Sequence, residues 1–173
     1  MKKQICIIFF VVGFISCKSS QELETVNNVD LKKYSGLWYE IARLPNRFEK
    51  DMQFVTAKYI LQPSGDIQVI NSGITSKGVL KSSKGRAWVP NSKYPGRLKV
   101  SFFWPFSGDY YIIYLNREYT LALVGSPSRK YFWILSKNPS VDKSIYSEML
   151  NIARNKGFDV SKIEDTKQNL INK

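Results

Sequence analysis

The chain has 173 residues, with 26 Lys and Arg against 14 Asp and Glu, a formal net charge of +12 and no histidine. Without histidine it cannot build a Ser-His-Asp or Cys-His nucleophile, nor the His-containing zinc and haem sites. We therefore predict no metal site and no cofactor. The basic charge favours anionic partners such as phospholipid headgroups, although it also suits a surface that only keeps the protein in solution. No motif points to nucleic-acid binding.

The first 16 residues have the pattern of a secretory leader. Two lysines precede an apolar run at residues 5–15, which is shorter than the ~20 apolar residues that span a bilayer. The leader ends at a Ser-Cys junction that resembles the bacterial lipoprotein box, in which the cysteine is acylated and becomes the new N-terminus. We expect Cys17 to carry acyl chains as a membrane anchor; an ordinary cleaved leader is the alternative. Residues 17–28 are polar and predict a tether, and residues 29–173 predict one domain.

Short runs rich in aromatic and β-branched residues then alternate with turn residues, which is typical of β-strands. Eight strands are expected, at residues 38–44, 55–61, 66–75, 85–90, 97–103, 109–115, 119–125 and 131–136. Charged and apolar residues alternate along several of them, so that charge marks one face. The regular spacing predicts an all-β fold, an eight-stranded antiparallel up-and-down barrel.

The hydrophobic period changes after Pro139. The apolar residues Ile145, Met149, Ile152 and Ala153 fall on one face of a helix. Ser140 is a plausible N-cap and Gly157 a natural C-terminal stop. A single C-terminal helix after eight strands can bury its apolar face only against the outside of the barrel. On the last strand we expect Phe132 and Ile134 to lie beneath this helix, and a short ninth strand to follow from residue 163.

Three segments, in chain order, resemble the three signature regions of the lipocalins. They lie at residues 36–43, 116–124 and 131–139. Two further segments, at 99–106 and 157–161, resemble the bacterial outer-membrane lipoprotein lipocalins in particular, and apolipoprotein D is a more distant relative. The resemblance covers nearly all of residues 26–165 and implies the same barrel with one outer helix.

The strand order brings the three signature regions to the same end of the barrel, which we call the floor. The resemblance implies that Gly36, Trp38, Arg117, Tyr119 and Lys137 close this end and do not contact the ligand. The family normally has arginine where this chain has Lys137. Lysine lacks the planar fork of arginine, but it can still place its charge over the Trp38 indole.

The opposite end, the mouth, is built by loops at residues 44–53, 76–84, 104–109 and 126–130. These loops contain the basic residues Arg47, Lys50, Lys77, Lys81, Lys84, Arg129 and Lys130, and the acidic residues Glu49, Asp51 and Asp109. They also carry Phe48, Trp104 and Phe106. A basic rim with aromatic side chains suits an anionic headgroup at a bilayer surface; scattered charge on solvated loops is the alternative.

The family implies a carrier of small hydrophobic molecules, and an eight-stranded barrel is about wide enough for one. We predict binding, storage or transport of a fatty acid or lysophospholipid at the bacterial cell envelope, by a protein anchored to the outer membrane and facing the periplasm. The predicted ligand-binding residues are Ala57, Tyr59, Val69, Asn71, Ala87, Leu98, Val100, Phe102, Tyr110, Ile112, Tyr114 and Trp133. A solid core without a cavity is the alternative, and the sequence leaves open whether the chain is a monomer or a homodimer.

The same barrel could serve two alternative functions, catalysis and the transport of haem or a pigment. No catalytic residue is predicted and the protein is not expected to be an enzyme, because the only candidate acid–base group, Glu40, is expected at the floor. A haem or pigment carrier would need tyrosine or lysine ligation of the haem iron, for which the sequence has no specific signal.

Overall fold

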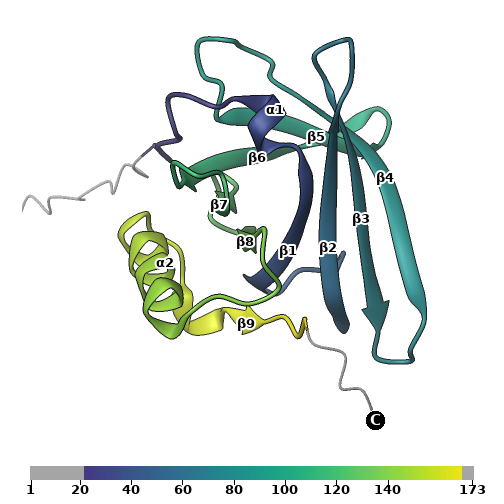
Figure 1. The fold of residues 1–173 in the computed structure, drawn as a ribbon, viewed down its shortest axis with the longest axis vertical. Helices are drawn as coiled ribbons and strands as arrows, with labels where there is room; N and C mark the ends of the chain where they lie inside the picture. The colour runs from purple at the N-terminus through teal and green to yellow at the C-terminus, as the bar shows by residue number, and fades with distance from the viewer. Residues whose placement is uncertain (1–21, 169–173) are drawn as a thin grey trace, which may run out of the picture.

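The structure is a computed structural model that describes residues 22–168 (Figure 1). The predicted leader and Cys17 lie outside these residues. The elements are α1 (Leu31–Tyr34), β1 (Gly36–Arg43), β2 (Met52–Leu61), β3 (Ile67–Thr75), β4 (Leu80–Trp88), β5 (Arg97–Phe103), β6 (Phe106–Leu115), β7 (Leu121–Gly125), β8 (Phe132–Ser136), α2 (Lys143–Asn155), the 3-10 turn η1 (Val160–Lys162) and β9 (Glu164–Asp165). None of the described helices is both long and apolar enough to cross a membrane.

The strands form a closed barrel. Each of β2 to β7 pairs antiparallel with the next strand along the chain, and β1 closes the ring by pairing with both β2 and β8. The short β9 pairs with the end of β1 on the edge that faces β2, opposite to the edge that pairs with β8. The predicted eight-stranded up-and-down barrel with one outer helix is confirmed, and Figure 1 shows α2 lying beside it.

Apolar side chains form two separate clusters, one on each side of the barrel wall. The inner cluster fills the floor half of the lumen and contains Trp38 and Leu135. The outer cluster lies beneath α2, where Met149 and Ala153 pack with Phe132 and other outward residues of the wall. The predicted alternation along β8 is therefore confirmed. Both faces of this strand are buried, which explains why its sequence is apolar throughout.

Several boundaries differ from the sequence prediction: β2 and β6 each begin three residues earlier than expected and β7 begins two residues later, and two further differences concern β4 and α2. β4 begins at Leu80, not at residue 85, because residues 80–84 pair with β3 although all five are exposed. This polar stretch lacks the apolar alternation by which strands are predicted. The N-cap of α2 is Asp142 in place of Ser140. Gly157 has a φ of +86° and ends the helix as predicted.

Part of the segment predicted as a tether packs on the barrel. Of its residues 17–28, those from 22 onward lie along the barrel wall. Leu23 is 2% exposed in the outer cluster, and the Val26 amide donates to the Ile112 carbonyl over 3.0 Å. The two apolar side chains in this mostly polar stretch explain why it docks.

Candidate functional site

The floor of the barrel is closed around one tryptophan. Trp38 is completely buried, and its indole Nε1 donates to the Tyr34 carbonyl over 2.7 Å. The Lys137 ammonium lies 4.4 Å from the centre of the Trp38 ring and donates to the Ser35 carbonyl over 2.6 Å. Burial lowers the pKa of Lys137. Gly36 has a φ of +107°, and a Cβ atom there would lie 3.0 Å from the Lys137 Nζ, so this position requires glycine.

The β6–β7 turn completes the floor. Tyr119 has a φ of +57°, and its hydroxyl accepts a hydrogen bond from the Asp30 amide over 2.9 Å. Asn116 shapes the turn, because its Oδ1 accepts from the Thr120 and Leu121 amides over 2.8 and 2.9 Å. Arg117 was expected among the closure residues, but its side chain is exposed. The β6–β7 turn leaves this side chain in solvent.

Most of the predicted lining residues face the lumen. Ala57, Tyr59, Val69, Ala87, Leu98 and Ile112 are buried members of the inner cluster, and Val100, Phe102, Tyr110 and Trp133 pack against it while remaining partly accessible. Tyr114 was predicted to face the lumen, but it packs in the outer cluster. A register shift between Ile112 and Tyr114 in the β6–β7 ladder interrupts the alternation and turns this side chain outward.

Three tyrosine hydroxyls meet inside the barrel. The Tyr110 hydroxyl lies 2.7 Å from that of Tyr34 and 2.8 Å from that of Tyr59. Burial raises the pKa of all three phenols, so they stay protonated. Three hydroxyl protons serve two hydrogen bonds, so one proton remains to be donated elsewhere.

Asn71 adds a polar atom to the same wall. It pairs in register with Ala57, and Tyr59 pairs with Val69, so Asn71 and Tyr59 are diagonal neighbours on one face of the sheet. The Asn71 Oδ1 is buried and has no hydrogen-bond partner within residues 22–168. A buried acceptor without a donor is costly, and a polar group of a bound molecule would satisfy it.

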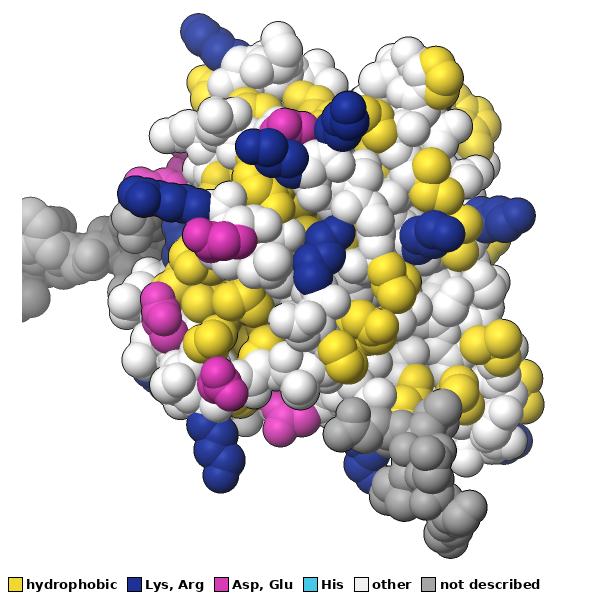
Figure 2. All heavy atoms as spheres, in the orientation of Figure 1, with side chains coloured by type: hydrophobic (Ala, Val, Ile, Leu, Met, Phe, Trp, Pro, Cys, Tyr) yellow, Lys and Arg dark blue, Asp and Glu magenta, His cyan; other side chains and the backbone are white. Residues whose placement is uncertain are grey.

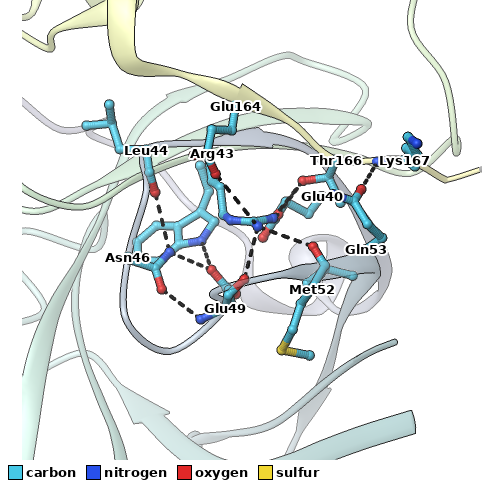
Figure 3. A network of polar contacts seen from close by, with 12 residues as sticks. Glu40, Arg43, Leu44, Asn46, Glu49, Met52, Gln53, Glu164, Thr166 and Lys167 are labelled. Carbon is cyan, nitrogen blue, oxygen red and sulfur yellow. Dashed lines mark hydrogen bonds and ion pairs between the residues drawn. The ribbon is translucent and has the colours of Figure 1, made fainter. Parts of the chain in front are cut away.

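A buried polar network lies on the mouth side of β1 (Figure 3). The Arg43 guanidinium donates to the Glu40 carboxylate over 2.6 Å, to the Thr166 hydroxyl over 3.0 Å and to the Glu49 carbonyl over 3.0 Å. Loss of hydration on burial, together with the Glu49 carboxylate, raises the pKa of Glu40 from 4.5 to about 7, against the opposing effect of its hydrogen bonds and of Arg43. Glu40 was expected at the floor; a register shift between Glu40 and Ala42 directs it toward Arg43 instead.

The network also holds the β1–β2 loop against the inner wall. The Glu49 carboxylate accepts from the Trp133 indole Nε1 and from the Asn46 amide, both over 2.8 Å. Arg43 and Glu49 were not among the predicted site residues. The only signal in the sequence is that two opposite charges, Glu40 and Arg43, share a strand that otherwise reads as apolar.

Residues 164–168, the C-terminal segment, fill a gap in the wall. The β1–β2 ladder ends at the pair Tyr39–Thr56. Beyond it, the Gln168 side-chain amide donates to the Glu40 carbonyl of β1 over 2.7 Å and to the Val55 carbonyl of β2 over 2.8 Å. The mouth half of the wall between these two strands is therefore closed by residues 164–168.

A groove of about 660 Å³ opens where β4 and β5 separate. It is lined by Gly85, Arg86, Trp88, Ser101, Phe102 and Trp104. The β4–β5 ladder ends at the pair Arg86–Ser101. Gly85 allows the Phe102 ring to approach, because a Cβ at this position would lie 2.8 Å from that ring.

Charge is unevenly distributed over the surface. In Figure 2, the half of the face that carries β2 to β4 shows Lys and Arg side chains, and the acidic side chains in view lie on the half that carries α2 or near the middle. Lys and Arg side chains also lie on the half that carries α2, so in this view the two halves differ mainly in where the acidic side chains lie.

Comparisons with known proteins agree with this architecture. The family described as lipocalin-like domain matches residues 29–168. The outer membrane lipoprotein Blc of Escherichia coli (strain K12) is 45% identical over 155 residues, which cover 89% of this chain and 88% of that protein. Apolipoprotein D of Mus musculus is 33% identical over 150 residues, covering 82% of this chain and 78% of that protein. Insecticyanin from the tobacco hornworm Manduca sexta has a similar solved structure, with a TM-score of 0.68, 23% identity and 84% of each chain covered.

Proposed function

The chain belongs to the lipocalin family, and we propose that it binds a single-chain amphiphilic lipid, a fatty acid or a lysophospholipid, in the lumen of its barrel. The observation that carries this proposal is the state of the inner wall. Val100, Phe102, Tyr110 and Trp133 face inward yet remain partly accessible. Inward apolar side chains that other side chains do not cover leave room for a ligand of the same character.

The acyl chain supplies most of the affinity in this proposal. Burial of ~14 methylenes yields on the order of 10 kcal/mol gross, whereas an exposed ion pair at the mouth contributes only ~0–1 kcal/mol. The floor closed by Trp38 and Lys137 stops the chain from passing through. The spare hydroxyl proton of the tyrosine group and the unpartnered Asn71 Oδ1 are available to a polar part of the ligand.

The proposed place of action is the outer membrane, with the barrel facing the periplasm. Support comes from the leader with its Ser-Cys junction and from the relatives that are named outer membrane lipoproteins. Acylation of Cys17 would keep the barrel beside the membrane from which single-chain lipids are released. Mass spectrometry of the mature N-terminus tests this part directly, and an unmodified Cys17 would reject it.

Titration of delipidated protein with fluorescent fatty acids of increasing chain length tests the ligand. We expect saturable binding that tightens with chain length. In Val100→Trp the larger ring occupies space that about two methylenes would fill, so affinity should fall about tenfold. Lys58→Trp is the matched control, since Lys58 is exposed on β2. Equal affinity in both variants, or no saturable binding by an intact barrel, would reject the proposal.

A further inference from the structure

Three large aromatic side chains face solvent at the tip of the β5–β6 hairpin. Phe103, Trp104 and Phe106 are 78%, 85% and 77% exposed. Phe103 and Phe106 are register partners, so their side chains lie on the same face of the hairpin. The Ser101 hydroxyl donates to the Phe106 carbonyl over 2.6 Å, which fixes the base of the tip. Clustered exposed aromatics of this kind mark an interaction site more often than a solvated loop.

The hairpin projects beyond the part of the wall that supports it. The last β4–β5 pair is Arg86–Ser101, two residues before Phe103. Trp104 borders the groove whose other side is formed by Trp88 and Arg86. The tip therefore stands free of the barrel at its mouth end, as does the neighbouring β3–β4 hairpin, where Leu80 is 71% exposed.

The charge beside the hairpin is positive. Nearby Arg86 and Lys99 are each paired with a carboxylate, Asp66 and Asp109 respectively, with 2.7 Å between charged atoms. Lys81 and Lys84 on β4 are exposed and form no ion pair within the described part of the chain. A Cβ on Gly85, the residue that follows Lys84, would lie 2.7 Å from the Ser101 carbonyl oxygen and 2.8 Å from the Phe102 ring, so Lys84 lies beside the base of the hairpin. Lys84 is therefore an uncompensated charge beside the hairpin that carries the three aromatic side chains, and Lys81 lies further along the same strand toward the β3–β4 turn.

We propose that the hairpin tip, defined as Phe103, Trp104 and Phe106, inserts into the interface of an anionic phospholipid bilayer while Lys81 and Lys84 contact the headgroups. Tryptophan and phenylalanine favour this interface, and clustered lysines are attracted to anionic lipids. A second copy of the chain fits less well. The same lysines would repel it, and three side chains bury far less than the ~1,200 Å² of a stable protein interface.

This docking orients the barrel as well as attaching it. Because the tip lies at the mouth end, its insertion turns the opening of the lumen toward the lipid surface. The inference does not depend on which molecule the lumen binds.

Quenching of tryptophan fluorescence by brominated lipids tests the proposal. The full-length acylated protein is placed in vesicles of phosphatidylcholine and phosphatidylglycerol whose acyl chains carry bromine. We expect quenching of the unmodified protein, loss of most of that quenching in Trp104→Phe, and a similar loss when Phe103→Ser and Phe106→Ser are combined. Lys81→Glu with Lys84→Glu should also lower the quenching, as should added salt. All of these side chains are exposed, so the barrel should fold in each variant.

Tyr94→Ser is the matched control, because Tyr94 is 43% exposed in the β4–β5 loop at the floor end. It should leave the quenching unchanged. The proposal is overturned if acylated protein sediments with the vesicles without quenching, or if Trp104→Phe is quenched as strongly as the unmodified protein. It is also overturned if the serine variants abolish a lipid-independent self-association, which would make the tip a contact between copies. Titration with fluorescent fatty acids should be unaltered in every variant, so failure of docking and failure of lipid binding are separately visible.

Discussion

The Lys137 ammonium lies over the Trp38 indole, at the position where the resemblance to the lipocalin signature implies an arginine. It lies 4.4 Å from the ring centre and also donates to the Ser35 carbonyl at 2.6 Å. One side chain thus links the end of β8 to the segment that joins α1 to β1. The geometry explains why lysine is accepted, since the contact needs a cation above the indole and one donor, but not a planar fork.

Lys137→Ala should lower the free energy of unfolding by about 1–2 kcal/mol, because it removes the cation from the indole and leaves the Ser35 carbonyl without its donor. Lys137→Arg should retain most of that stability. Urea denaturation followed by tryptophan fluorescence measures both. Lys130→Ala, at an exposed position in the β7–β8 turn, is the control and should be neutral. Equal stability of the two alanine variants would show that the floor does not need this contact.

Gly125 is predicted to be intolerant of a side chain. A Cβ there would lie 2.5 Å from the Phe158 ring, and Phe158 is itself 3% exposed and packed 4.8 Å from the Phe132 ring centre. Gly125→Ala should therefore destabilise the protein by about 1–3 kcal/mol through overpacking. Gly108→Ala provides the comparison, because nothing lies within 4 Å of its added Cβ. Thermal unfolding should separate the two variants; similar melting temperatures would mean that α2 and the segment after it are free to shift.

The barrel and its floor could be predicted because they depend on local patterns. The alternation on β8 assigned Phe132 to the outer cluster and Trp133 to the lumen, and the signature residues located Trp38 and Lys137. The alternation failed at Tyr114, where one extra residue in the ladder reverses every side chain that follows. Such a shift depends on how two strands pair, which neither strand encodes alone.

The polar network was beyond prediction for a different reason. Arg43 and Thr166 are 123 positions apart in the chain, yet they are hydrogen-bonded in the buried wall. No periodicity relates them. The exposed stretch at 80–84 was missed because its strand character comes from hydrogen bonds to β3 and not from any buried face.

Stability should depend on pH through Glu40. Burial and the Glu49 carboxylate raise its pKa from 4.5 to about 7, so the folded protein favours the protonated acid. Its contribution is fully present below pH 4.5 and is lost as the pH rises toward 7. Relative to Glu40→Gln, the unmodified protein should therefore lose on the order of 1–3 kcal/mol across this window. Urea titrations of both proteins at several pH values measure the difference. If the difference in unfolding free energy between the two proteins stays constant with pH, or if the unmodified protein gains stability relative to Glu40→Gln as the pH rises, Arg43 keeps Glu40 ionised.

Gln168 should control the opening of the wall between β1 and β2. Its side-chain amide bridges the Glu40 and Val55 carbonyls at 2.7 and 2.8 Å, past the point where the two strands stop pairing. Gln168→Leu leaves both carbonyls without a donor, at a local cost of about 1–3 kcal/mol.

The expected result is faster hydrogen exchange at the two amides that tie the C-terminal segment to the barrel. These are Phe54, which donates to the Lys167 carbonyl, and Thr166, which donates to the Ile41 carbonyl. Lys167→Ala is the matched control, because the exposed Lys167 contributes its backbone to these bonds. Amides of the floor half of β1 should exchange as before in both variants, since the ladder there is intact. Acceleration across the whole barrel would instead mean that Gln168 supports global stability, and unchanged exchange at Phe54 would mean that the wall stays closed without it.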